Sequence, residues 1–110
     1  MGESAVQPYY AVIFTSERSL AEPDEYAAIT ERMVELARQQ PGFLGIDSAR
    51  GSDGVGITVS YWQDRESIKA WKNVAEHQTA QQLGREKWYR NFKVRICRVE
   101  NEYSFETPTN

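Results

Sequence analysis

The stretch Phe-Leu-Gly-Ile-Asp-Ser-Ala-Arg-Gly-Ser-Asp-Gly-Val-Gly-Ile-Thr-Val-Ser-Tyr-Trp, residues 43–62, sets the fold of this chain. Two runs suited to strands, Phe43 to Arg50 and Gly56 to Trp62, flank the four residues from Gly51 to Gly54. The Asp53-Gly54 pair is typical of a hairpin turn with positive φ, because glycine adopts that conformation without steric cost. The sequence therefore predicts an antiparallel hairpin at the centre of the chain.

A helix is predicted on each side of this hairpin. Before it, the Pro23-Asp24 pair supplies a helix start, apolar residues follow at spacings of three and four, and Pro41-Gly42 marks the end. After it, Asp64 is a candidate N-cap. We expect this second helix to run on towards Trp88, with a break near residues 73–75.

The outermost segments, Tyr9 to Thr15 and Asn91 to Tyr103, are rich in aromatic and β-branched residues and are predicted to be strands. The resulting order, β-α-β-β-α-β, predicts the α+β class and a ferredoxin-like fold: a four-stranded antiparallel sheet with both helices on one face. We expect a single domain over residues 1–110, with an ordered core of about 8–105. In the last strand, alternation divides the side chains into two sets, Phe92, Val94 and Ile96 against Lys93, Arg95, Cys97 and Val99.

The first strand is apolar on both faces. Tyr9, Ala11 and Ile13 alternate with a second apolar set that includes Phe14. Two helices cover one face of such a sheet, so something else must cover the other. A second copy of the chain does so, and a homodimer is predicted; coverage by long loops or by the C-terminal tail is the alternative.

Composition excludes several classes of function. The chain has 13 Lys and Arg residues and 16 Asp and Glu residues, for a net charge of −3. This balance does not indicate a basic surface for binding nucleic acid. The single cysteine, Cys97, makes no internal disulfide and is expected to be a small buried residue. No apolar run is long enough for a membrane span, and a cytoplasmic location is expected. The sequence lacks the motifs of phosphate loops, metalloproteases and EF-hands, so no metal and no cofactor is predicted.

The second helix holds the residues most suited to chemistry. Histidine is the residue type that changes charge most readily under physiological conditions, so His77, the only histidine, is a candidate base, or else a solvated helix residue. Trp71 packs in the core or lines an aromatic pocket. Arg95 pairs with an anionic oxygen, or else makes a surface or dimer salt bridge. The remaining candidates for an apolar ligand site are Trp62, Trp88, Tyr89 and Phe14.

The stretch Ser-Tyr-Trp-Gln-Asp-Arg-Glu-Ser-Ile-Lys-Ala-Trp-Lys at 60–72, the later Glu-His and Gly-Arg-Glu-Lys-Trp-Tyr, and the Pro41-Gly42-Phe43 turn resemble the antibiotic biosynthesis monooxygenase domain family. This resemblance implies a dimeric α+β barrel. Quinol monooxygenases of that family carry Asn, then Trp four residues later, then Tyr six after that. Trp71 matches the Trp, whereas Ser67 stands at the Asn position and His77 at the Tyr position. Haem-degrading members place a His ten residues after the Trp, where this chain has Gln81.

The resemblance implies a cofactor-independent monooxygenase that oxidises a small aromatic or quinol-type substrate with molecular oxygen. In that role His77 is the expected base, Trp71 the ring wall, Ser67 a hydrogen-bond donor and Arg95 an oxyanion partner. Two alternatives stay open. One is a non-enzymatic dimeric protein that binds a small ligand, and the other is a haem-binding or haem-degrading member of the same family.

Overall fold

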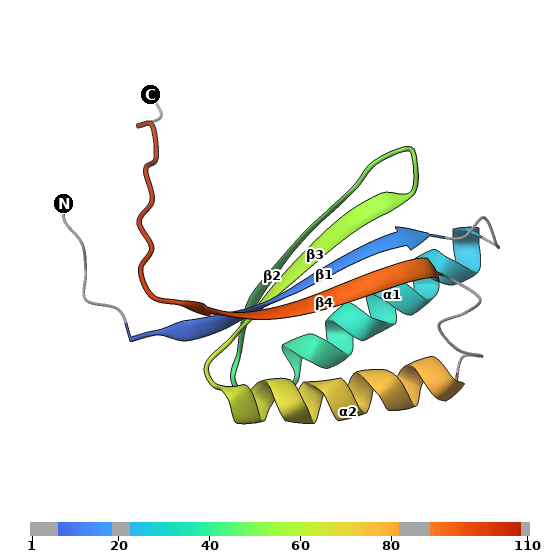
Figure 1. Cartoon of the computed structure of the whole chain (residues 1–110), viewed down its shortest axis with the longest axis horizontal. Coiled ribbons are helices and arrows are strands. Elements are labelled where there is room, and N and C mark those ends of the chain that lie inside the picture. Colours follow the sequence, from blue (N-terminus) through green and yellow to red (C-terminus); the bar gives the residue numbers. More distant parts are fainter. Residues whose placement is uncertain (1–6, 19–22, 82–88, 109–110) are drawn as a thin grey trace.

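A computed structural model of the chain describes residues 7–18, 23–81 and 89–108. Its elements, in chain order, are β1 (Tyr9–Arg18), α1 (Pro23–Arg38), β2 (Phe43–Arg50), β3 (Val55–Trp62), α2 (Arg65–Gln81) and β4 (Tyr89–Val99). The described strands form a four-stranded antiparallel sheet in the order β2-β3-β1-β4. Both helices lie on one side of it (Figure 1), so the predicted ferredoxin-like α+β fold is confirmed. None of the helices in the described ranges is long and apolar enough to cross a membrane.

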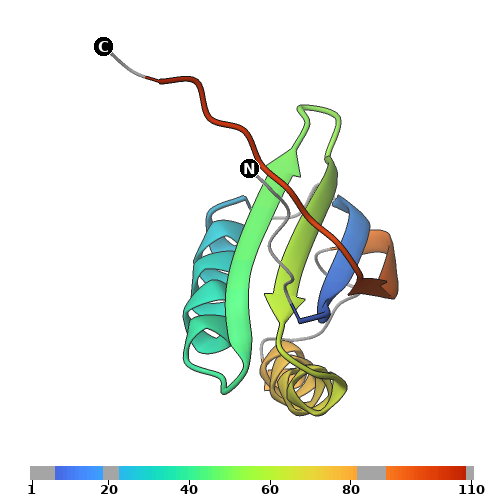
Figure 2. The same ribbon diagram turned by 90° about the vertical axis from the view of Figure 1, so that its left-hand side faces the viewer.

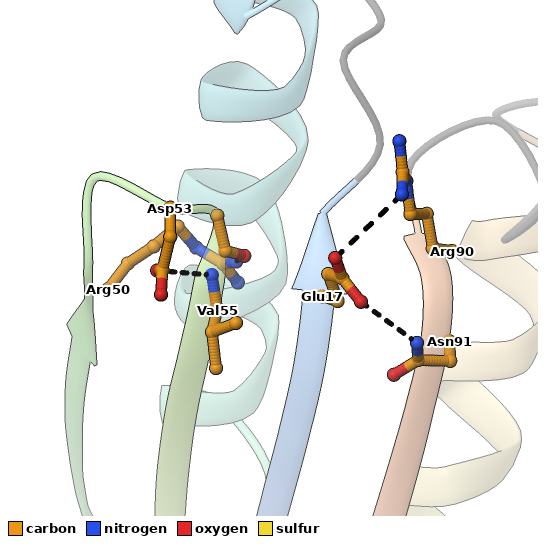
Figure 3. A network of polar contacts seen from close by, with 7 residues as sticks. Glu17, Arg50, Asp53, Val55, Arg90 and Asn91 are labelled. Atoms are coloured by element: carbon orange, nitrogen blue, oxygen red, sulfur yellow. Dashed lines mark hydrogen bonds and ion pairs between the residues drawn. The ribbon is translucent and has the colours of Figure 1, made fainter.

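The central hairpin forms as predicted. Gly54 has a φ of 90°, and the Gly51 N–H donates to the Val55 carbonyl oxygen at 2.9 Å. The Asp53 carboxylate accepts a hydrogen bond from the Val55 N–H at 3.0 Å (Figure 3). The Arg50 guanidinium donates to the Gly54 carbonyl. Backbone and side-chain hydrogen bonds therefore both stabilise the turn.

A second polar contact joins β4 to the end of β1. The Glu17 carboxylate accepts a hydrogen bond from Asn91 Nδ2 at 3.2 Å and lies 4.0 Å from the Arg90 guanidinium (Figure 3). These contacts are exposed and contribute little to stability. They lie beside the register shift between Glu17 and Arg18, where β4 enters the sheet.

The two faces of the sheet follow from strand register. Tyr10 pairs with Trp62, and Val12 pairs with both Ser60 and Ile96, so these side chains point to the face that carries the helices, called here the helix face. The opposite side is called the outer face. Figure 2 shows the strands from one end, with α1 and α2 on the same side of them.

Trp62 is the centre of the core on the helix face. Its side chain is fully buried and packs with Ala37 and Ile68, which bring α1 and α2 onto the sheet. The indole N–H donates to the Ser60 hydroxyl at 2.8 Å, so the one polar atom of this large side chain has a partner inside the core.

Three expectations about the elements are wrong. The second helix continues through residues 73–75 without a break, because Val74 and Ala75 keep the helical spacing from Trp71 and remain half-buried. The last strand ends at Val99, and residues 100–108 form no regular structure. Cys97 is exposed in the single chain, because it lies on the outer face of an edge strand. The expected course of the second helix beyond Gln81, towards Trp88, lies outside the described residues.

The C-terminal segment does not cover the outer face. Residues 100–108 leave the sheet on the side away from the helices (Figure 1), and Tyr103 and Phe105 are 90% and 86% exposed. Near the sheet, a hydrogen bond with the Glu102 carboxylate and then burial raise the pKa of Tyr9. Burial and a hydrogen bond with Asp47 raise the pKa of Tyr61, to which the Glu102 charge also contributes. Val55 and Ile57 therefore stay exposed on the outer face of β3.

Gly42 fixes the start of α2 against the turn that follows α1. It has a φ of 83°, and a Cβ at this position would lie 2.1 Å from the Ser67 hydroxyl oxygen. The Gln63 N–H also donates to the Gly42 carbonyl at 2.7 Å. The backbone of Gly42 thus contacts the Ser67 side chain directly, and no space remains for a methyl group at position 42.

We predict that Gly42→Ala lowers the free energy of unfolding by about 2–4 kcal/mol, because it adds backbone strain and displaces Ser67. Gly54→Ala is the matched control, since Gly54 also has positive φ but its added Cβ meets nothing closer than 3.5 Å. Backbone strain alone should cost that variant about 1–2 kcal/mol. Urea unfolding followed by circular dichroism measures both, and equal losses would contradict the crowding at Gly42.

Candidate functional site

An apolar strip on the helix face of β4 is left uncovered by the described helices. It consists of Phe92, Val94 and Ile96, which are 36%, 47% and 52% exposed. Register places them on the helix face, because Val94 pairs with Phe14 and Ile96 with Val12. The helices pack instead on the other half of this face, α1 on β2 and α2 on β3. We call these three residues the β4 strip.

Aromatic rings extend one end of the β4 strip onto β1. The Phe14 and Phe92 rings are stacked, with centroids 5.3 Å apart, and Tyr89 meets Phe14 edge-on at 5.4 Å. Phe14 and Tyr89 are half-buried. Two of the predicted ligand-binding residues, Phe14 and Tyr89, therefore lie in contact. Phe92, which the prediction did not include, lies beside both of them.

The tryptophans form a separate group. Trp62 and Trp71 are stacked with centroids 5.9 Å apart, and Phe43 meets Trp62 edge-on at 5.4 Å. Because Trp62 is fully buried, it is a core residue and presents no surface to a ligand. Trp71 is half-buried and keeps part of its surface free of the core. Trp88 lies outside the described residues.

Ser67, at the start of α2, is hydrogen-bonded to Asp64. Its hydroxyl donates to Asp64 Oδ1 at 2.7 Å, and its backbone N–H donates to the same oxygen at 2.8 Å. Asp64 is thus the N-cap that the sequence predicted. The Ser67 hydroxyl and then its backbone N–H hold the pKa of Asp64 below the ordinary 3.8. In this geometry the Ser67 hydroxyl proton points to a protein carboxylate.

His77 and Trp71 do not share a helix face. Six residues at about 100° each set them roughly 120° apart around α2, and the His77 side chain is exposed. Arg95 lies still further away, on the outer face of β4 beside Ile13. The structure therefore does not bring His77, Ser67, Trp71 and Arg95 into one constellation.

A polar pair next to the aromatic rings was not foreseen. Ser16 is buried and accepts a hydrogen bond from Arg50 Nη2 at 3.1 Å. The guanidinium reaches it across Gly56, where a Cβ would lie 2.6 Å from the Arg50 Cζ atom. Ser16 pairs with Phe92, so this hydroxyl lies beside the end of the β4 strip. Register across all four strands brings these residues together, and no local pattern in the sequence indicates it.

The arrangement suits a flat apolar ligand. Ligand sites are mostly apolar with a few polar groups that fix orientation, and the β4 strip with its aromatic rings and the Ser16 hydroxyl has this character. Within the described ranges no group of three His, Cys, Asp or Glu side chains is placed to hold a metal ion.

Comparison with known proteins identifies the family. The family model "Antibiotic biosynthesis monooxygenase" matches residues 10–83. The chain belongs to the antibiotic biosynthesis monooxygenase family. It is 48% identical over 103 residues to the uncharacterized protein YqjZ of Bacillus subtilis (strain 168), covering 94% of this chain and 90% of that protein.

Two other proteins that resemble this chain are oxygenases. The jasmonate monooxygenase ABM of Pyricularia oryzae is 25% identical over 92 residues, which cover 82% of this chain and 43% of that protein. The structure of a mutant of SnoaB, a cofactor-independent oxygenase from Streptomyces nogalater, matches with a TM-score of 0.67 and 12% identity, covering 88% of this chain and 97% of that one. The likeness to SnoaB shows that the two proteins share a fold.

We predict that the cap at Asp64 makes stability depend on pH. A carboxyl whose folded-state pKa is depressed stabilises the fold above its unfolded-state pKa, and this contribution is lost as pH falls through the folded-state value. Asp64→Asn keeps an acceptor oxygen but loses the charge. The difference in free energy of unfolding between the wild type and this variant should therefore become smaller as pH falls from about 5 to about 2. Urea unfolding across this range measures it, and a constant difference would contradict the role of the charge.

Proposed function

We propose that this chain is a cofactor-independent monooxygenase that oxidises a small electron-rich phenol or quinol with molecular oxygen. The observation that carries the proposal is the partly exposed β4 strip with the stacked Phe14 and Phe92 rings, on the fold of a family whose solved structures include a cofactor-independent oxygenase. An apolar wall of this kind binds and orients a planar substrate.

The reaction needs no external reductant. The phenol loses its proton, the phenolate passes an electron to oxygen, and recombination of the two radicals forms a carbon–oxygen bond. The resulting hydroperoxide loses water, so one oxygen atom enters the quinone and the other leaves as water. The phenol supplies all four electrons that reduce the oxygen molecule. The protein's part is to bind, orient and accept a proton.

In this proposal His77 accepts the phenol proton and Trp71 orients the ring from α2. His77 is the only histidine of the sequence, and an imidazole is the side chain that most often serves as a general base. The His77 side chain is exposed and lies roughly 120° around the helix axis from Trp71. The substrate must therefore bind along the side of α2 for its proton to reach His77.

A second candidate, binding of a small aromatic ligand without turnover, is favoured by one observation. The Ser67 hydroxyl, which would orient a substrate oxygen, donates to Asp64 in this structure. The β4 strip and its rings serve binding equally well with or without proton transfer.

We also propose that the protein works as a homodimer packed through the outer faces of two sheets. Support comes from the apolar residues that stay exposed there and from the C-terminal segment, which leaves that face open. Apolar side chains that lie together on an exposed face commonly mark a surface for interaction with another protein.

We predict that Val94→Asp weakens binding of an aromatic probe such as a naphthol by at least about tenfold, because a carboxylate in the apolar wall must be desolvated. Val94 is 47% exposed, so the variant keeps the core intact. Val94→Leu, which keeps the wall apolar, is the matched control and should bind within about threefold of the wild type. Fluorescence titration gives both constants; equal affinity of the two variants would exclude the strip as the binding surface.

We predict that His77→Ala lowers kcat for a quinol by about 10²–10⁴ with little change in KM, because proton transfer occurs only in the transition state. Asn73→Ala, at an exposed position on the same helix, should leave both constants unchanged. Oxygen uptake measures turnover. Full activity of His77→Ala with an unchanged pH profile would place the base elsewhere, and aromatic binding without oxygen uptake by the wild type would favour the second candidate.

A further inference from the structure

One row of side chains crosses the outer face with an acid at one edge and a base at the other. The β2–β3 register sets Asp47 beside Val59, and the β3–β1 register sets Val59 beside Ile13. The β1–β4 register sets Ile13 beside Arg95. Directly paired residues of antiparallel strands point to the same face. The row, called here the charged row, is Asp47, Val59, Ile13, Arg95.

The two charges of this row cannot meet within one chain. They are separated by three strand spacings, about 14 Å, and both side chains are exposed. Asp47 accepts a hydrogen bond from the Tyr61 hydroxyl at 3.1 Å, whereas Arg95 makes no ion pair with any described residue. Each end of the row is therefore available to a molecule that lies on the outer face.

We propose that a second copy of this chain packs on the outer face with the two-fold axis along the strands, so that Asp47 of each copy pairs with the partner's Arg95. This inference rests on the homodimer proposed above and adds the register in which the two sheets meet. A two-fold axis along the strands lays β4 of one copy over β2 of the other and β1 over β3. The charged row then faces itself in reverse, with Val59 against the partner's Ile13 between two ion pairs.

The charges distinguish this packing from the other two-fold arrangement. An axis across the strands would lay β2 over β2 and β4 over β4. Where that axis passes through the charged row, it sets Asp47 against the partner's Asp47 and Arg95 against the partner's Arg95, and like charges placed together oppose association. The axis along the strands replaces two repulsive contacts by two attractive ones.

Side-chain size agrees with the same axis. The next outward-facing row towards the start of β1 contains Gly45, Tyr61, Ala11 and Cys97. In the proposed packing Tyr61 faces the partner's Ala11, and Cys97 faces the partner's Gly45. A larger side chain thus meets a smaller one at each position, as close packing of two sheets about 10 Å apart requires. An extended arginine and an aspartate together span such a gap.

Charge reversal tests the register. In sedimentation velocity experiments at low ionic strength, Asp47→Arg and Arg95→Asp should each raise the dimer dissociation constant at least about tenfold, since each reversal alters both symmetric contacts. The double variant Asp47→Arg/Arg95→Asp restores opposite charges and should return to within about threefold of the wild type. Arg98→Asp is the matched control, because Arg98 pairs with Tyr10 on the helix face of the same strand, and its dissociation constant should equal that of the wild type.

If circular dichroism shows that a charge-reversal variant is unfolded, variants that remove the charge without reversing it provide the test instead. Interfacial ion pairs weaken as salt screens them, so the wild-type dissociation constant should rise with ionic strength. Asp47→Asn and Arg95→Gln should each flatten this dependence.

Two results would overturn the inference in different ways. A wild-type protein that is monomeric at micromolar concentration would remove the homodimer and the register together. A dimeric wild type whose affinity is unchanged by both single reversals, or a double variant weaker than either single one, would remove the register alone and leave the homodimer standing. Neither result bears on oxygen uptake.

Discussion

The burial of Trp62 is the constraint on which the rest of this structure depends. Its side chain at the end of β3 is fully buried, and it contacts residues from β2 and α2. An indole of this size buries about 150–250 Å² and fixes where the helices lie on the sheet. Because that anchor lies on β3, the helices pack over β2 and β3, and within the described ranges neither helix covers the helix side of β4. The candidate site is therefore a consequence of where the core is centred.

The sheet separates two tasks by face. On the helix face, the β4 strip and the Phe14 ring offer an apolar surface beside the buried Ser16 hydroxyl. On the outer face, the same strand presents Arg95 and Cys97. In the function and the homodimer proposed above, alternation along β4 lets one strand contact the ligand on one side and the partner on the other. A substitution in β4 acts on one of these according to whether its position is even or odd.

Much of the fold was predictable because its signals are local. The hairpin turn at Gly54, the cap at Asp64 and the alternation of Val94 with Arg95 each depend on neighbours in sequence, and each is confirmed. The helix break near residues 73–75 was wrong because weak helix propensity there is outweighed by the half-buried positions of Val74 and Ala75.

The candidate site was harder to predict because it depends on contacts between distant segments. Ser16, Arg50 and Phe92 come together through register across the sheet, which no local pattern of residues indicates. The resemblance to quinol monooxygenases supplied helix positions such as Ser67 and His77, but spacing along a helix does not say which hydroxyl is already hydrogen-bonded or which side chain faces solvent. The family relation is secure from sequence, whereas the roles of these side chains depend on packing.

The basic residues of β4 have one more consequence, for behaviour at high protein concentration. Strand β4 is an edge of the sheet, and its open backbone is a template on which another strand can add. Within eleven residues it carries four positive charges, Arg90, Lys93, Arg95 and Arg98. Growth of fibrils through β4-to-β4 pairing would bring these charges together along the new ladder and is opposed by their repulsion. These charges therefore disfavour polymerisation through this edge, even while apolar side chains of the sheet are exposed.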